Sequence, residues 1–173
     1  MERADLARRI YDTAHLTGTF TLRSGVTSTE YFDKYRFESD PTLLRAIAEH
    51  LVPLVPSGTE GLAGLELGGV PLATALAQVM GLPAFFVRKE AKTYGTCQLA
   101  EGGAIEGRRL TVVEDVVTSG GQVIASCADL RALGATIDRV LCVIDRQAGG
   151  REKLAAEDLE LAALFQMEEL TPS

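Results

Sequence analysis

The sequence predicts an α/β protein with a central, mostly parallel sheet that is flanked by helices. Short apolar, β-branched runs such as residues 110–113 alternate with segments in which apolar residues recur at helical spacing. Turns of small or charged residues follow three of these runs, at Glu66–Val70, Glu114–Gly121 and Asp145–Gly150. Right-handed βαβ units bring the carboxyl ends of parallel strands to one edge, where such sheets bind ligands. We therefore expect the three turns to form one site.

The first 40 residues predict a helix and a small pair of strands outside the main sheet. Apolar residues recur at helical spacing within residues 3–16, which predicts an amphipathic first helix. Phe20 and Leu22 then alternate with polar neighbours, and a serine-glycine turn separates them from the predicted returning strand, Tyr31–Asp33. We expect these elements to form a hood, from residue 1 to about residue 40, on a core from about residue 41 to residue 173.

Residues 40–87 predict a helix, a strand, a second helix and a second strand. Asp40 and Pro41 are typical of the N-cap and the first position of a helix, and apolar residues at helical spacing continue to about Leu54. A short apolar run, an apolar segment bounded by glycines and another apolar run follow. They predict a strand over residues 61–66, a helix over residues 70–80 and a strand over residues 84–87.

The second half of the chain continues the alternation after a polar loop over residues 88–103. Apolar runs and helical spacings there predict a strand over residues 110–113, a helix from about Gln122 to Gly134, a strand over residues 140–144, a short helix over residues 151–156 and a last strand over residues 159–165. No internal repeat or linker divides the sequence. We therefore expect a single domain over residues 1–173.

The run LTVVEDVVTSGGQ, residues 110–122, has the pattern of a phosphate-binding turn. Backbone N–H groups of the glycine-rich segment Thr118–Gly121 would point inward, and the start of the following helix adds positive potential. The lysine of a P-loop and the GxGxxG spacing of a dinucleotide site are both missing. Glu114 and Asp115 favour a ribose beside the phosphate, because carboxylates accept hydrogen bonds from vicinal hydroxyls. An ordinary strand-to-helix turn is the alternative.

The loop over residues 88–103 concentrates Arg88, Lys89 and Lys92 in a chain whose net charge is −7. Long loops without secondary structure are often active-site lids, and its glycines would allow it to open and close. The cations suit a departing pyrophosphate, because negative charge develops on the leaving oxygens. A solvated charged loop is the alternative.

Composition and charge limit the classes of partner. The net acidity argues against DNA or RNA, which bind proteins largely through positive charge. No apolar run approaches the roughly 20 residues of a membrane helix, and the charged N-terminal segment lacks the apolar stretch of a signal peptide. We therefore expect a cytoplasmic protein with no membrane partner. The cysteines Cys97, Cys127 and Cys142 lack the spacing of a zinc site, and we expect the latter two in the core.

The run VVEDVVTSGGQ resembles the phosphoribosyl pyrophosphate (PRPP) motif of type I phosphoribosyltransferases. Four further segments resemble the orotate phosphoribosyltransferases within that superfamily: FTLRSGVTSTEYFD, RKEAKTYG, ELGGVPLATALA and VIDRQAGG. The resemblance runs from the first helix to about Leu154. It implies the type I phosphoribosyltransferase fold and a Mg²⁺-dependent transfer from PRPP to orotate, which gives orotidine 5′-monophosphate and pyrophosphate for pyrimidine biosynthesis.

The resemblance also implies the roles of individual residues. Lys92 and Asp115 would be catalytic, and orotate would bind at Arg23, Tyr31, Phe32, Thr118 and Arg146. PRPP would bind at Arg88, Lys89, Lys92, Glu114, Asp115, Val116, Val117, Thr118, Ser119, Gly120 and Gly121. Mg²⁺ would be held through PRPP oxygens. The chain would form a homodimer in which the loop over residues 88–103 completes the neighbouring site.

Some positions differ from the pattern of the family, and two other functions stay open. Tyr94 stands where well-studied bacterial members have His, and Gly68 stands where some members have Lys. One alternative is a phosphoribosyltransferase for another nucleobase. A measurement of orotate binding would distinguish it from an orotate phosphoribosyltransferase. The other is a non-enzymatic PRPP-sensing regulator, against which the cations Arg88, Lys89 and Lys92 argue.

Overall fold

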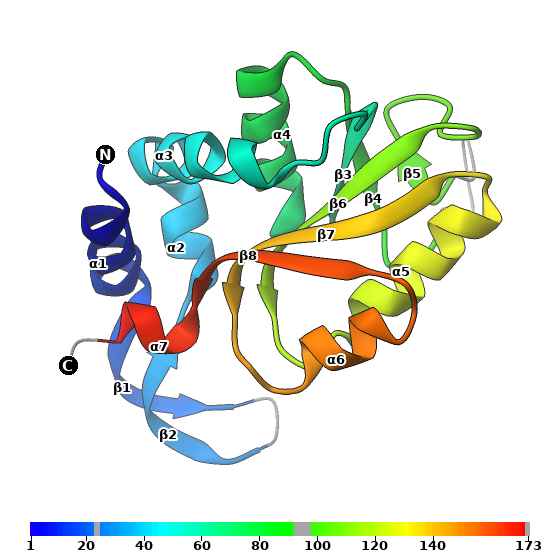
Figure 1. Cartoon of the computed structure of the whole chain (residues 1–173). Helices are drawn as coiled ribbons and strands as arrows, with labels where there is room; N and C mark the ends of the chain where they lie inside the picture. The colour runs from blue at the N-terminus through cyan, green and yellow to red at the C-terminus, as the bar shows by residue number, and fades with distance from the viewer. Residues whose placement is uncertain (23–24, 92–97, 172–173) are drawn as a thin grey trace.

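The structure, a computed structural model, describes residues 1–22, 25–91 and 98–171 and is built on a six-stranded sheet (Figure 1). The strand order is β5-β4-β3-β6-β7-β8, and all neighbours are parallel except β4 and β5. The strands are β3 (Gly61–Leu65), β4 (Ala84–Val87), β5 (Ala100–Glu101), β6 (Arg109–Val117), β7 (Thr136–Asp145) and β8 (Glu160–Gln166). The predicted α/β class with a mostly parallel sheet is confirmed.

Helices cover both faces of the sheet because alternate residues of its strands are apolar on both sides. Val113 and Leu141 pack in one apolar cluster with α1 (Arg3–Ala14), α3 (Pro41–Leu51) and α4 (Gly69–Met80). Their neighbours Val112 and Val140 pack in a second cluster with α5 (Gly121–Ala132) and α6 (Gly150–Ala155). Cys127 and Cys142 are buried in the second cluster, as expected, and burial raises the pKa of both thiols.

A separate two-stranded antiparallel sheet stands below the main sheet in Figure 1, formed by β1 (His15–Thr21) and β2 (Thr27–Phe32). The expected strand pair outside the main sheet is thus confirmed, although both strands are longer than predicted. The division into hood and core near residue 40 stays a prediction. The first helix belongs by sequence to the predicted hood but packs against the core, because Leu6 and Ile10 of α1 are part of the first apolar cluster.

Several short elements were not predicted. They are α2 (Lys34–Ser39), the 3₁₀ turn Val52–Leu54, the edge strand β5 and α7 (Met167–Leu170). Each is too short to show a period in the sequence. β5 lies inside the stretch predicted as an unstructured loop, and it forms because Val87 and Phe86 of β4 offer it an antiparallel partner.

The central strand is also longer than its apolar run. We predicted a strand over residues 110–113, but β6 continues to Val117, because β7 pairs with it along that whole length. The pairing with β3, in contrast, ends at Gly64 and Val113. Glu114 and Asp115 therefore lie within the strand, on an edge that faces no neighbouring strand on the β3 side.

This edge lies at the point where the chain changes direction in the sheet. From β3 the chain passes to β4 on one side, and from β6 it passes to β7 on the other. In open α/β sheets ligands bind in the crevice at such a switch point, beyond the carboxyl ends of the strands. The three predicted turns follow β3, β6 and β7 and meet there.

No helix in the described part of the chain is long and apolar enough to cross a membrane.

The start of α3 allows the predicted helix N-cap, Asp40, to be tested. The Asp40 carboxylate accepts hydrogen bonds from the backbone N–H groups of Thr42 (2.8 Å) and Leu43 (3.0 Å), as the sequence predicts. Asp40→Ala should lower the free energy of unfolding by about 1 kcal/mol, because these two donors lose their partner. Urea denaturation measures the change. Asp129→Ala, on the exposed side of α5, is the control and should change it by less than about 0.5 kcal/mol. Equal effects of the two substitutions would contradict the N-cap role.

Candidate active site

The turn Thr118–Gly121 joins β6 to α5 and is shaped to receive an anion. Gly120 has φ 75°, a left-handed conformation that favours glycine, and it is the N-cap of α5 without a side chain that caps the helix. The first N–H groups of α5 therefore remain available, and the helix dipole adds positive potential there. Thr118 and Ser119 are exposed beside them, so their hydroxyls can donate as well.

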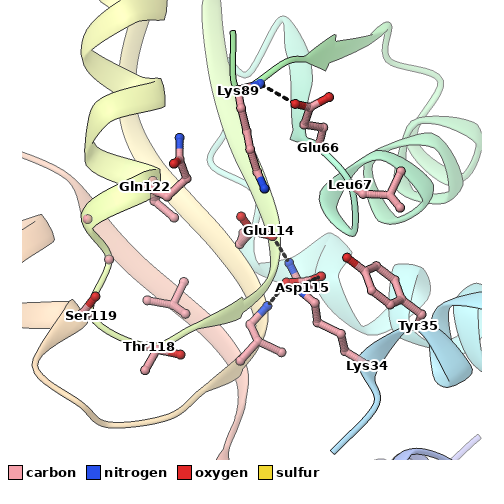
Figure 2. Close-up of a pocket in the computed structure, with 15 residues that line it drawn as sticks. Lys34, Tyr35, Glu66, Leu67, Lys89, Glu114, Asp115, Thr118, Ser119 and Gln122 are labelled. Atoms are coloured by element: carbon pink, nitrogen blue, oxygen red, sulfur yellow. Dashed lines mark hydrogen bonds and ion pairs between the residues drawn. The ribbon is translucent and has the colours of Figure 1, made fainter. Parts of the chain in front are cut away.

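This turn forms one wall of a cavity of about 460 Å³, which we call the first cavity (Figure 2). Most of the predicted PRPP-binding residues line it: Lys89, Glu114, Asp115, Val116, Val117, Thr118, Ser119, Gly120 and Gly121. The opposite wall comes from Lys34 and Tyr35 of α2 and from Glu66 and Leu67 after β3. The structure thus brings the predicted phosphate turn, the acid pair and one loop cation together.

The two acids of β6 have different surroundings, because successive side chains of a strand point to opposite faces. Glu114 accepts a hydrogen bond from the backbone N–H of Asp115 (2.9 Å). Asp115 is fully buried, and its Oδ2 lies 2.6 Å from Nζ of Lys34, which is the only ion pair of Asp115 within the described residues. Its Oδ1 accepts from the backbone N–H of Val116. Each acid thus accepts a hydrogen bond from the backbone N–H of the residue that follows it in β6.

A third carboxyl group, that of Glu38 in α2, is buried next to Asp115. Burial, together with the charge of Asp115, raises the pKa of Glu38 to about 9 and that of Glu114 to about 8. Burial alone would lower the pKa of Lys34, but the Asp115 ion pair and the Glu114 charge outweigh it and raise that pKa. Near pH 7 the group therefore consists of two neutral carboxyls and one ion pair.

A second cavity, of about 590 Å³, adjoins the first. It contains four of the predicted orotate-binding residues: Tyr31, Phe32, Thr118 and Arg146. Lys34, Val116 and Thr118 line both cavities, so the two spaces meet at these residues. The backbone N–H of Arg146 donates to the carbonyl of Val117 (2.9 Å), which holds the end of β7 against the end of β6. An exposed guanidinium beside aromatic side chains suits a planar anion.

The loop cations are placed differently from one another. The backbone N–H of Lys89 donates to Oε1 of Glu66 (2.7 Å), and its side chain points into the first cavity (Figure 2). Arg88 was predicted at the same site, but its side chain pairs with Glu101 (Nε to Oε1, 3.6 Å) and lines a neighbouring hollow, which shares Glu66 and Leu67 with the first cavity. Lys92, Tyr94 and Arg23 lie outside the described residues.

Several residues of the first cavity were not predicted from the sequence: Lys34, Tyr35 and Gln122, with Glu38 behind them. Lys34 had one usable signal, since it directly follows the predicted strand Tyr31–Asp33. The helix that carries it was not predicted, and its approach to Asp115 depends on tertiary packing. The structure explains why position 68 is glycine, which the sequence alone does not show. A Cβ there would lie 1.6 Å from Oδ2 of Asp115.

Comparisons with known proteins agree with this geometry. The family model described as phosphoribosyl transferase domain matches residues 56–159. The chain is 53% identical over 167 residues to the orotate phosphoribosyltransferase of Nocardioides sp., a match that covers 96% of this chain and 93% of the relative.

Solved structures of Mycobacterium tuberculosis orotate phosphoribosyltransferase have the same fold. The complex with Fe(III) dicitrate superposes with a TM-score of 0.86 at 31% identity and covers 98% of this chain and 99% of that one. The complex with PRPP superposes with a TM-score of 0.83 at 29% identity and covers 97% and 98% of the two chains. Together with the phosphate turn, the acid pair and the adjoining aromatic cavity, these matches show that the chain belongs to the phosphoribosyltransferase family and, within it, to the orotate phosphoribosyltransferases.

Proposed function

We propose that the chain transfers the phosphoribosyl group of PRPP to orotate and so forms orotidine 5′-monophosphate and pyrophosphate. The observation that carries the proposal is the junction of the two cavities at Lys34, Val116 and Thr118. A phosphate turn and acid pair on one side of it suit PRPP, and an aromatic wall with Arg146 on the other suits an anionic pyrimidine. Relatives named orotate phosphoribosyltransferase support the same substrates.

In this proposal the 5′-phosphate lies in the turn Thr118–Gly121, and the ribose hydroxyls face Glu114 and Asp115. The bond between C1 and the pyrophosphate oxygen breaks, and its electron pair leaves with pyrophosphate. The lone pair of orotate N1 forms the new bond to C1 with inversion, after N1 has lost its proton to solvent or on binding. Holding both reactants in adjoining cavities supplies much of the rate, because it removes their translational freedom before the reaction.

Charge is the second contribution of the site. Positive charge builds on the ribose ring in the transition state, and the carboxylate of Asp115 beside it is favourable. Lys89 lines the first cavity and can stabilise the departing pyrophosphate, as can Lys92 on the basis of the sequence resemblance. Closure of the lid, residues 88–103, would exclude water and so prevent hydrolysis of PRPP.

Mg²⁺ is part of the proposal, held through PRPP oxygens. Mg²⁺ prefers oxygen ligands and usually binds through substrate phosphates with only one or two carboxylates, rather than in an all-protein cage. The described residues fit this pattern: the first cavity has carboxyl groups on its walls, and within that part of the chain no set of three metal-binding side chains is arranged to hold an ion by itself. When bound, the ion would neutralise charge on the pyrophosphate.

A homodimer and a cytoplasmic location are further parts of the proposal. The position of Arg88 supports the dimer, because its side chain lies outside the first cavity of its own chain.

The reaction itself is tested by following orotate absorbance in the presence of PRPP and Mg²⁺. We expect a loss of orotate that requires PRPP, and Lys92→Ala should reduce kcat/KM about a hundredfold because a cation at the leaving group is lost. Lys153→Ala, at an exposed position of α6, is the control and should leave the rate unchanged. If PRPP bound but orotate did not react, the proposed substrate would be wrong, and a panel of other nucleobases or a regulatory function would be examined instead.

Recognition of the base is tested at Arg146. Arg146→Met should raise the KM for orotate about tenfold to a hundredfold, because a charged hydrogen bond contributes about 1.5–3 kcal/mol. The KM for PRPP should stay within about twofold of the wild-type value, since Arg146 lines only the second cavity. Steady-state kinetics with each substrate varied in turn measure both values. Equal increases for the two substrates would contradict the assignment of the second cavity to the base.

A further inference from the structure

Lys34 is placed where the two cavities meet, and its contacts set it apart from the loop cations. Its Nζ lies 2.6 Å from Oδ2 of Asp115, and it also lines both the first and the second cavity (Figure 2). About a third of the Lys34 side chain is exposed (34%), whereas the Asp115 side chain is fully buried (0%). The ammonium group therefore lies between a buried acid and the open space of the two cavities.

The packing around Gly68 explains why Asp115 depends on this contact. A Cβ at Gly68 would lie 1.6 Å from Oδ2 of Asp115 and 2.8 Å from Oε1 of Glu38, so the absence of a side chain makes room for both carboxyl groups. The two acids gather at this backbone, with Glu114 adjacent in β6. A buried carboxylate is costly unless it is paired, and among the described residues Lys34 is the cation that acts on all three acids.

We propose that Lys34 is a positioning residue of the active site, which keeps Asp115 ionised and held at the junction of the two cavities. The ionised carboxylate can then accept a hydrogen bond from a ribose hydroxyl of PRPP and favour the positive charge that builds on the ribose. This inference rests on the proposed function. It assigns a role to a residue that acts through Asp115 rather than by contact with the phosphates.

The charged and titratable groups around Asp115 determine what happens when the lysine is removed. Lys34, Tyr35 and Glu38 face it from α2, Glu114 lies next to it in β6, and Glu66 lines the same cavity from the turn after β3. Without the ammonium group, the three carboxyls lose the one described cation that acts on all of them, and as a coupled set they bind one more proton at neutral pH. The site then offers PRPP a neutral carboxyl, and it regains the carboxylate as the pH rises.

The test measures PRPP affinity by titration calorimetry with Mg²⁺ and without a base, so that it does not depend on turnover of orotate. The proteins are wild type, Lys34→Met, Lys34→Arg and the exposed-site control Lys153→Met. PRPP phosphates also titrate, so each variant is compared with wild type at the same pH. We expect the loss of affinity in Lys34→Met to be at least about tenfold larger near pH 6.5 than near pH 8.5, because each pH unit below the titration changes the ionised fraction about tenfold. Lys34→Arg should restore most of the affinity.

A double-mutant cycle separates action through Asp115 from direct binding of the phosphates. In the Asp115→Asn background, Lys34→Met should change PRPP affinity by less than about threefold. An equal loss in both backgrounds, or a loss in Lys34→Met that does not change with pH, would overturn the inference. If Lys34→Met alone does not fold, Asp115→Asn and the double variant still decide between the two roles, because neither leaves an unpaired buried carboxylate at position 115. Failure of the wild type to bind PRPP would instead overturn the proposed function.

Discussion

The difference in length between β3 and β6 determines where the site lies. β3 pairs with β6 only as far as Val113, whereas β7 pairs with it to Val117, so four residues of β6 extend beyond the strand on one side. Within this extension, the side chains of Glu114 and Asp115 accept hydrogen bonds from the backbone N–H groups of Asp115 and Val116. The same extension carries Thr118–Gly121 to the start of α5. The acid pair thus lies on the part of β6 that β3 leaves unpaired, and the phosphate turn follows directly after it.

Electrostatics explains how an acidic chain can bind an anionic substrate. The net charge is −7, and three carboxyl groups lie at the bottom of the site. Two of them are held neutral by burial near pH 7, and the third is paired with Lys34, so the fixed charge of the cluster is much smaller than its composition suggests. Positive potential is supplied locally, by the start of α5 and by Lys89. A negative net charge therefore argues less strongly against a small anionic substrate than against a polyanion such as DNA or RNA.

Local signals in the sequence predicted the parts of the molecule that depend on local structure. Asp40 and Pro41 identify the start of α3, and the small residues Thr118–Gly121 identify the phosphate turn, because in both cases the backbone needs those residues. The full length of β6 was not predictable from its apolar run, since it depends on pairing with β7. The same limit applies to Lys34, whose ion pair with Asp115 joins residues that are distant in the chain, and to the side chain of Arg88, which is directed by Glu101 of β5.

The most direct test of the whole arrangement is a crystal structure of the protein with orotidine 5′-monophosphate, the product of the proposed reaction. We expect the phosphate to accept hydrogen bonds from backbone N–H groups of Thr118–Gly121, the ribose to lie beside Glu114 and Asp115, and the carboxylate of the base to face Arg146 in the second cavity. A nucleotide bound away from the end of β6, or one with its base in the first cavity and its phosphate at Arg146, would contradict it.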